Sequence, residues 1–351
     1  MKKILFVIFT ALLVFTGCKK ETDVKTIKIP LVTWGGYAAL FAANNGPEPK
    51  EDSLFYKYGN FKVELVQVED PSLHLQGFSN GTYDIIWATM DMLPLQYEAL
   101  ATDPRSVPKV IGVFDYSAGG DGIVVRDGIR NASDMIGKKV VVPQYQPSHY
   151  FFLWYLNSNG IDPSQVNFVY AEDAIKAKDT YINDRSISVC VTWSPFIYDI
   201  TDPTKNTYVE GSSLLLTTAI DTPAFGVIAD VYLTNADFFN NNPEIIRAFT
   251  KAMLDGYDLY KADPDKVAGY IAEFFGIPGG IDEVKLMFGD VVIAGRTENG
   301  WFFDKNNPKS GYAIMESSLD LYKRDGKLDR NYSINPDDVI EPHFMNEFIS
   351  Q

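Results

Sequence analysis

The feature of this sequence that most constrains its fold is a repeated alternation of strand-like and helix-like segments. The runs TIKIPLVTW (26–34) and FKVELVQVE (61–69) have the pattern of strands, and GGYAALFAANNG (35–46) between them has that of a helix. The strand-like run YDIIWATM (83–90) follows a further helical stretch. Strands that alternate with helices favour parallel sheets built from right-handed crossover units. The sequence therefore predicts an α/β fold.

A glycine-rich segment divides this alternation into two units. The run DYSAGGDGIVV (115–125) places glycines and aspartates between two strand-like stretches, and strand and helix signals resume beyond it. From about Phe225 the chain returns through an apolar stretch and becomes mainly helical, including IDEVKLMFGDVV (281–292). We expect two doubly wound domains with two crossings and a ligand cleft between them. The predicted boundaries are 26–115 and 225–351 for lobe I, and 116–224 for lobe II.

The first residues predict export and lipid attachment. Two lysines, an apolar run and small residues are typical of a signal peptide over residues 1–17. FTGC (15–18) is similar to a lipobox, in which the cysteine becomes the lipidated first residue, and residues 18–25 suit a polar tether. An ordinary signal peptide with a chance cysteine is the alternative. With Cys18 lipidated, Cys190 has no disulfide partner, and its apolar strand indicates a buried inert thiol.

Charge and motif content exclude several classes of function. The formal net charge is −15, and it becomes −17 once residues 1–17, which contain two lysines, are removed. An acidic chain with no basic run is a poor candidate for binding nucleic acid or anionic lipid. His74, His149 and His343 lie too far apart in sequence for paired zinc ligands. The chain contains no GxSxG, phosphate-loop, HExxH or complete GxGxxG motif. We expect no metal, no cofactor and no catalysis.

The carboxyl ends of the predicted strands supply the candidate binding residues, because ligands of open α/β sheets lie there. The aromatic residues at these ends are Trp34, Tyr37, Tyr116, Tyr145, Tyr150, Trp193 and Phe225. The acidic ones are Asp91, Asp115, Asp121 and Asp221. No arginine or lysine occurs in this set, whereas a site for sulfonate or nitrate usually recruits arginine. Aromatic faces with carboxylates indicate a cationic or flat, nitrogen-rich ligand. The alternative is an anion held by backbone amides at the helix start near Ser148 to Tyr150.

Each candidate also has an ordinary structural explanation. Trp34 and Trp193 close strand-like runs and could simply cap the core. Asp121 lies between glycines, where an aspartate commonly satisfies the amides of its own turn. Asp91 could cap the following helix, and His149 could bond locally near a helix start.

Several segments together resemble the solute-binding proteins of ABC importers of the nitrate, sulfonate, taurine and thiamine-pyrimidine type. The resemblance covers residues 26–350. The segments that carry it are GTYDIIWAT (81–89), SAGGDGIVV (117–125), ASDMIGKKVVVPQYQPSHYFFLWYLNSNGI (132–161), DAIKAKDTY (173–181) and VTWSPF (191–196). It implies a two-lobed periplasmic-binding-protein-like fold of type II, with the two lobes closing around one small molecule.

The resemblance also implies particular binding positions. Carried onto matching residues, it suggests Trp34, Gly35, Tyr37, Thr89 and Asp91 in lobe I, and Ser148, His149 and Trp193 in lobe II. The strand-end analysis adds Asp121, Tyr145 and Asp221. VTWSPF departs from the pattern of the family, which more commonly has an acidic residue where this chain has Ser194.

The expected function is that of a substrate-binding lipoprotein that captures a small nitrogenous or aromatic solute for import. Its partners would be an ABC permease with its ATPase and, through the lipid on Cys18, a membrane in the periplasm or at the cell surface. We expect a monomer with no nucleic-acid partner. The alternatives are an anion binder of the same fold, a sensor domain that serves a receptor, and an enzyme of the thiamine-pyrimidine type. The predicted signal peptide argues against the enzyme, because those enzymes are cytoplasmic.

Overall fold

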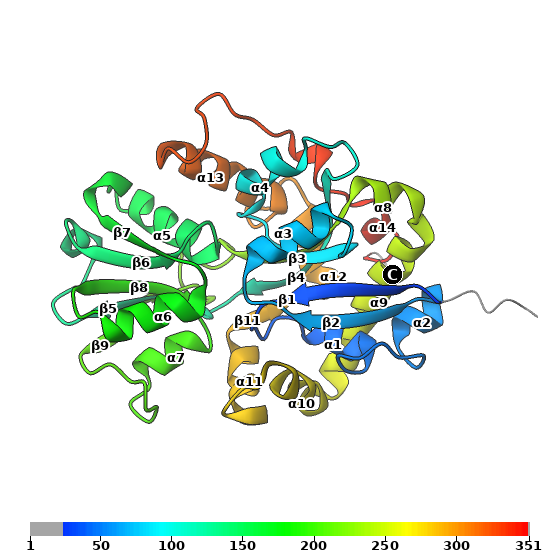
Figure 1. Cartoon of the computed structure of the whole chain (residues 1–351), viewed down its shortest axis with the longest axis horizontal. Helices are drawn as coiled ribbons and strands as arrows, with labels where there is room; N and C mark the ends of the chain where they lie inside the picture. The colour runs from blue at the N-terminus through cyan, green and yellow to red at the C-terminus, as the bar shows by residue number, and fades with distance from the viewer. Residues whose placement is uncertain (1–23, 350–351) are drawn as a thin grey trace, which may run out of the picture.

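A computed structural model describes residues 24–349 and shows two α/β lobes side by side (Figure 1). The predicted signal peptide and Cys18 lie outside the described residues. No helix in the described part of the chain has the length and apolar character needed to cross a bilayer.

Lobe I contains six strands in two hydrogen-bonded groups. One group pairs β1 (Thr26–Leu31) with β2 (Lys62–Gln67) in parallel. The other has the order β11–β4–β10–β3 and consists of β3 (Ile85–Thr89), β4 (Pro108–Ser117), β10 (Ala229–Asn235) and β11 (Val291–Ile293). β1 also packs beside β3, so the two groups form one continuous layer.

Helices surround this layer on both sides (Figure 1). Those that precede the first crossing are α1 (Ala38–Asn44), α2 (Leu54–Gly59), α3 (Pro71–Ser79) and α4 (Leu93–Leu100). Those that follow the return are α8 (Ala236–Asn241), α9 (Pro243–Ala262), α10 (Pro264–Phe275), α11 (Gly280–Gly289), α12 (Arg296–Phe303), α13 (Gly311–Arg324) and α14 (His343–Asn346). Helices α9 and α10 are strongly amphipathic, so their apolar faces extend the lobe I core.

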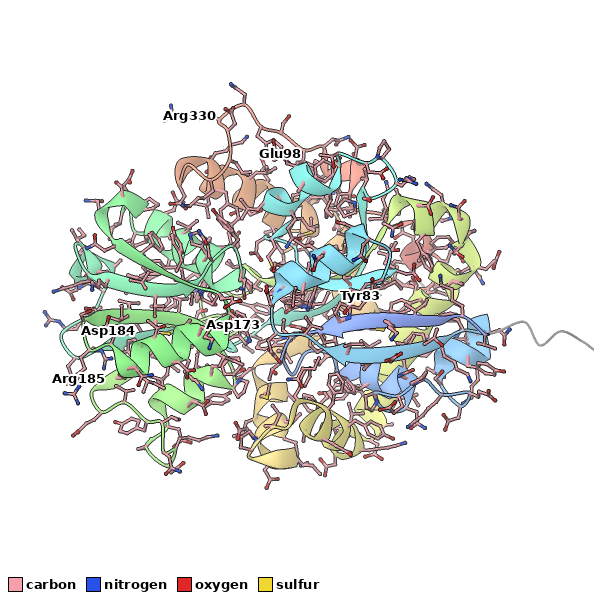
Figure 2. All side chains as sticks on the ribbon, in the orientation of Figure 1. Tyr83, Glu98, Asp173, Asp184, Arg185 and Arg330 are labelled. Atoms are coloured by element: carbon pink, nitrogen blue, oxygen red, sulfur yellow. The ribbon has the colours of Figure 1, made fainter. Side chains whose placement is uncertain are left out.

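Lobe II is a five-stranded sheet of order β7–β6–β8–β5–β9. Its strands are β5 (Asp121–Arg126), β6 (Lys139–Pro143), β7 (Asn167–Ala171), β8 (Ile187–Trp193) and β9 (Ser212–Thr217). Its helices are α5 (Pro147–Ser158) on one face, and α6 (Ala174–Asn183) and α7 (Phe196–Thr201) on the other (Figure 1). Separate apolar clusters fill the two faces, and charged residues such as Asp184 and Arg185 project from the outer end (Figure 2).

The sheets are mixed, although the alternation of strands and helices predicts parallel pairing. β5 runs antiparallel to β8 and β9, and β10 runs antiparallel to β3 and β4. These are the two strands that follow the crossings at 118–120 and 218–228. A strand that arrives from the other lobe enters its new sheet from the opposite end, which reverses its direction.

Two short strands also differ from the sequence pattern. The run 281–292 has a helical pattern, but α11 ends at Gly289 and the chain then forms β11 against β4. β9 lies at the edge of the lobe II sheet, and its sequence SSLLLT does not alternate between apolar and polar residues. Two of its residues are exposed. Cys190 is fully buried in the lobe II sheet, and burial raises the pKa of its thiol.

Helix α13 bridges the two lobes away from the crossings. Its residues Leu321 and Tyr322 pack against Tyr150 and Leu153 of α5, while α13 also contacts α4 of lobe I (Figure 1). The Tyr150 hydroxyl donates to Ser317 Oγ at 2.9 Å. The two lobes are therefore in contact both at the crossings and along this helix.

Candidate ligand-binding site

A small cavity lies between the lobes at the carboxyl ends of β1, β3 and β8. Atoms leave about 250 Å³ of space there, part of it open to solvent, and only about 10 Å³ admits the centre of a water molecule, so a larger solute requires the walls to move apart. Its lining consists of Val32, Trp34, Trp87, Thr89, Asp121, Pro147, Trp193, Ile228 and Asp230. Both lobes contribute, so the walls meet only when the lobes are together. Three of the five tryptophans of the chain line this one space.

Trp34 is held by a carboxylate and by two glycines. Its indole N–H donates to Asp115 Oδ2 on β4 at 3.1 Å. A Cβ on Gly36 would overlap both the Asp115 carboxylate and this indole nitrogen, and a Cβ on Gly120 would overlap the far edge of the ring. Glycine at these two positions lets the β1–α1 loop and the first crossing approach the ring closely. The local sequences WGG (34–36) and GGD (119–121) thus position the Trp34 ring, which forms one wall of the cavity.

Trp87 forms the second wall from the neighbouring strand β3. Its indole N–H donates to Asp230 Oδ1 on β10 at 2.5 Å. Thr89 follows two residues later, and the twofold repeat of a strand directs it to the same side. The hydroxyl of Thr89 is fully buried and has no hydrogen-bond partner among the described residues. Lobe I therefore presents two tryptophans and an unused hydroxyl.

Trp193 forms the third wall from lobe II. It is the last residue of β8, and its indole N–H donates to the backbone carbonyl of Thr33 in lobe I at 3.3 Å. The ring is only 4% exposed. This bond spans the cleft, so Trp193 both borders the cavity and joins the lobes.

Four buried aspartates surround the cavity or lie just behind it. Burial raises the pKa of Asp91, Asp115 and Asp121 to about 7 in each case. The pKa of Asp230 lies well above its ordinary value, because burial disfavours its charge and the nearby Asp115 adds repulsion. Among the described residues that line the cavity, none is lysine or arginine. The site is thus rich in acceptors and lacks a protein cation.

Several of these acceptors lack partners. Asp121 Oδ1 and Thr89 Oγ1 belong to cavity-lining residues, and neither has a hydrogen bond within the described chain. Both oxygens of Asp91 and the hydroxyl of Ser148 are also buried and unpaired there. A buried polar group without a partner costs about 1–3 kcal/mol, so each such atom marks a place for a ligand donor or an ordered water. Within residues 24–349, no group of three potential ligands is arranged to hold a metal ion.

The structure brings together part of the predicted binding set. Trp34, Thr89, Asp121 and Trp193 line the cavity. Gly35, Tyr37, Asp91 and Ser148 are buried next to lining residues, and the charges of Asp230 and Asp115 act on the Tyr37 hydroxyl. Tyr145, His149 and Asp221 lie elsewhere.

These last three residues have other surroundings. His149 is fully buried, and its Nε2 lies 3.5 Å from Asp325 Oδ2. Tyr145 is 41% exposed and lines an open groove between α3, α4 and residues 144–146. Asp221 is exposed on the second crossing.

The strand-end analysis missed Trp87 and Asp230. Trp87 lies inside YDIIWATM, two residues before Thr89, so the alternation along that strand could have identified it. Asp230 is a lone carboxylate in the apolar run that forms β10, which is an unusual composition for a buried strand. Its partner Asp115 was one of the acidic candidates at the predicted strand ends, but it was not in the final set of predicted binding positions.

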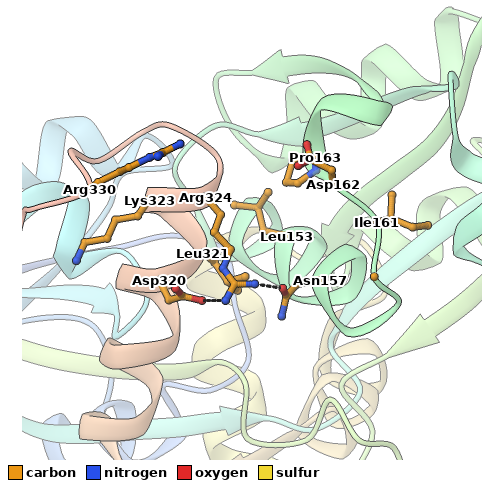
Figure 3. Close-up of a pocket in the computed structure, with 11 residues that line it drawn as sticks. Leu153, Asn157, Ile161, Asp162, Pro163, Asp320, Leu321, Lys323, Arg324 and Arg330 are labelled. Atoms are coloured by element: carbon orange, nitrogen blue, oxygen red, sulfur yellow. Dashed lines mark hydrogen bonds and ion pairs between the residues drawn. The ribbon is translucent and has the colours of Figure 1, made fainter.

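A second interlobe hollow has the opposite character. The open groove between α5 and α13 has about 1260 Å³ of space and is lined by Lys323, Arg324 and Arg330 as well as by acids and apolar residues. Figure 3 shows Arg324 bridging from α13 to Asn157 of α5, where its Nη1 donates to Asn157 Oδ1 at 2.6 Å. The groove is wide and open, with few buried polar atoms. The smaller cavity is therefore the better candidate for specific binding.

Contacts on the α7 side also join the lobes. The Tyr198 hydroxyl of α7 donates to the carboxylate of Asp290, which precedes β11. Lys205 pairs with Glu283 of α11 at 2.8 Å. The structure is thus a closed arrangement, with the cavity enclosed between contacts on both sides.

Comparisons with known proteins agree with this architecture. The sequence matches the family described as NMT1/THI5 like over residues 51–267. The taurine-binding periplasmic protein of Escherichia coli K12 is 27% identical over 236 residues, covering 65% of this chain and 69% of that protein.

Solved structures show the same fold. The aliphatic sulphonate-binding protein of Escherichia coli has a TM-score of 0.65 at 15% identity, covering 87% of this chain and 89% of its own. The nitrate-binding protein of Synechocystis PCC 6803 has a TM-score of 0.67 at 13% identity, covering 93% and 88%. Both are periplasmic binding proteins, so the predicted fold is confirmed.

Proposed function

The chain belongs to the NMT1/THI5-like family, and on that premise we propose that it is the solute-binding component of an ABC importer. It closes its lobes around one small molecule and presents the closed form to a permease. The homologous taurine-binding protein and the shared fold of the sulphonate- and nitrate-binding proteins support this role. The same relationship supports binding rather than catalysis.

The solute that fits the cavity best is a small cation with N–H groups. The observation that carries this proposal is the lining itself, with three tryptophans, unpaired oxygens on Asp121 and Thr89, and no lysine or arginine among the described residues. Tryptophan faces attract cations, and N–H donors satisfy the unpaired oxygens. A quaternary ammonium ion would leave those oxygens without donors, so an amine, amidine, guanidine or protonated aminopyrimidine is favoured.

Taurine, nitrate and sulfonates fit this lining less well. A sulfonate or nitrate group buried beside Asp121 would face an acidic side chain, and the described lining offers no lysine or arginine to pair with it. The amides at the start of α5, which follows Gln146, and the unpaired hydroxyls of Thr89 and Ser148 are donors for an anion. Taurine carries an ammonium group as well, so it is the informative anion to test.

The location and the anchor belong to the same proposal. The relative and the structural neighbours are periplasmic, and residues 1–18 have the pattern of a lipoprotein signal. We infer a monomer attached to a membrane through lipid on Cys18, with a permease and its ATPase as partners. Substitution of Cys18 by Ala should release the protein from the membrane fraction, whereas retention there would contradict the anchor.

Binding of a solute panel to the mature protein tests the proposed solute class. Calorimetry and thermal shift would compare guanidinium, methylammonium and 4-aminopyrimidine with urea, taurine and nitrate. We expect at least one cation to bind and to raise the melting temperature, because a ligand of the folded state stabilises it by mass action. Tight binding of nitrate or of a simple alkanesulfonate, with no cation bound, would overturn the cation assignment.

A further inference from the structure

We propose that Asp230 keeps a proton that it donates to Asp115, so that the two carboxyl groups together carry one negative charge. They act as positioning residues for Trp34 and Trp87, and they set the charge of the solute that the cavity accepts. The statement about solute charge rests on the proposed function, whereas the shared proton does not.

The two carboxyl groups form the centre of a chain that crosses lobe I beneath the cavity. Asp115 of β4 and Asp230 of β10 are direct cross-strand partners, and their carboxyl groups are within hydrogen-bonding contact. The indole of Trp34 bonds the first of them and the indole of Trp87 the second. The chain therefore runs from indole to carboxyl to carboxyl to indole, and it fixes both rings.

This chain is satisfied only if one proton lies between the carboxyl groups. Both residues are buried, and two adjacent carboxylates cannot both ionise without a large repulsion. Asp115 Oδ1 has no donor among the described groups when Asp230 is ionised. Burial raises the pKa of both carboxyl groups, and the charge of Asp115 raises that of Asp230 further. A proton on Asp230 supplies the donor that Asp115 Oδ1 lacks, so the proton belongs on Asp230.

The surroundings add no positive charge that would permit two carboxylates. Asp121 of lobe II repels both charges, and the buried hydroxyl of Tyr37 lies close enough to feel them. His74 packs its ring against Trp87 with 5.8 Å between ring centres. Burial lowers the pKa of His74 to about 4, so its ring is uncharged at neutral pH. In the described chain, the groups that face the pair are therefore acidic or neutral.

A fixed charge of one would select among solutes by their charge. The negative charge of the pair lies behind the rings of Trp34 and Trp87 and attracts a monocation in the cavity. A neutral molecule of the same shape lacks that attraction. The protonated Asp230 acts as a hydrogen-bond donor, and an asparagine amide can replace it in that role. An asparagine at Asp115 instead removes the charge, because burial, the largest cause of the raised pKa of Asp230, still disfavours ionisation of that group. The two positions should therefore respond differently to the same substitution.

Infrared spectroscopy of the ligand-free protein tests the proton directly. At about pH 9, groups with a pKa near 7 are ionised, so a remaining carboxylic acid C=O band would report a strongly perturbed carboxyl. We expect such a band in the wild-type protein and its loss in Asp230→Asn. Absence of the band, or its survival in Asp230→Asn, would overturn the assignment of the proton.

Guanidinium and urea, which share a planar shape but differ in charge, test the effect on specificity. Asp115→Asn should reduce the preference for guanidinium over urea by roughly 10-fold, the expected effect of losing a charge that lies behind the cavity wall and does not bond the solute. Asp230→Asn alters a residue that lines the cavity, so it should change the affinity for both solutes by a similar factor and the preference between them by less than about threefold. Melting temperatures of both variants would verify folding. Equal losses in the two variants would show that both carboxyl groups are charged, and a loss confined to Asp230→Asn would place the proton on Asp115.

The outcomes separate this inference from the proposed function. If the infrared band is lost in Asp230→Asn but no cation binds the wild-type protein, the proton assignment stands and the solute class is wrong. If a cation binds but the band is absent, the solute class stands and the shared proton is wrong.

Discussion

The two halves of the cavity are built in different ways. In lobe I, the indoles of Trp34 and Trp87 bond carboxyl groups of the same lobe. In lobe II, the indole of Trp193 bonds a lobe I carbonyl, and Asp121 Oδ1 has no partner in the described chain. The two lobe I indoles are thus bonded without the other lobe, whereas the lobe II indole acquires its bond on closure. We call the lobe I half, with Trp34 and Trp87, the platform, and the lobe II half, with Trp193 and Asp121, the cover. The difference indicates that the cover moves relative to a fixed platform.

The largest expected effect concerns Asp121, the carboxylate that lobe II would present to a cationic solute. Asp121→Asn should weaken binding of a cation such as guanidinium by about 1.5–3 kcal/mol, since a charged acceptor becomes neutral. Calorimetry would measure the change, and the Kd for urea serves as the matched neutral control. An equal loss for urea would show that Asp121 shapes the cavity without recognising charge.

The ionisation of Asp121 also gives the binding a pH dependence. Because burial raises its pKa to about 7, protons compete with the cation below that pH. Affinity should rise with pH up to about 7 and then level off, and Asp121→Asn should reduce this dependence, leaving the part that comes from Asp115, whose pKa is also about 7. The ligand-free protein has the opposite trend, because a raised pKa favours the folded state at low pH. Its stability should therefore fall as pH rises from about 4 to 7.

Trp193 tests whether the cover contributes aromatic contact. Trp193→Ala should weaken cation binding by about 1–3 kcal/mol if the ring stacks on the solute. Trp154→Ala in α5 is a matched control, since that half-buried ring is outside the cavity lining and should affect mainly stability. Unchanged affinity in Trp193→Ala together with a lower melting temperature would assign Trp193 to the core alone.

Gly120 tests the fixed platform. A Cβ at this position overlaps the ring of Trp34, so Gly120→Ala should displace the ring and cost about 1–3 kcal/mol in stability, with weaker binding. Gly300→Ala in α12 is the control, because its Cβ meets no atom within 4 Å and helix propensity favours alanine. Normal stability and affinity in Gly120→Ala would show that the position of Trp34 is adjustable.

The smallest effect is expected at the contact between α7 and Asp290. Tyr198→Phe removes the hydroxyl that donates to this carboxylate across the lobes. We expect a loss of about 0.5–1.5 kcal/mol in solute affinity. The substitution shifts the open-to-closed equilibrium toward the open form, which weakens the binding of every ligand that requires the closed form. X-ray scattering of the liganded protein would monitor closure. An unchanged Kd would mean that this contact does not contribute to closure.

The sequence predicted the fold more completely than the site. Alternation of strands and helices and the glycine-rich crossing led to the two-lobed arrangement, because those patterns depend on local backbone geometry. Trp34 and Trp193 were found at strand ends for the same reason. Asp230 was not, since its role depends on register with Asp115, which is 115 residues distant in sequence. His149 is the opposite case, because it was predicted to bind ligand but its ring lies beside Asp325, the residue that follows α13.

The ring of Trp34 lies against two loops that are far apart in the chain. Its ring excludes a side chain at Gly36 and at Gly120, which belong to different loops and are 84 positions apart. Replacing the tryptophan by a smaller residue would relieve the exclusion at Gly120, whereas the exclusion at Gly36 also requires the Asp115 side chain to move. Substitutions at Trp34 and Gly120 should therefore co-vary among homologues, and a directed-evolution library aimed at larger solutes should randomise Gly36 together with Asp115.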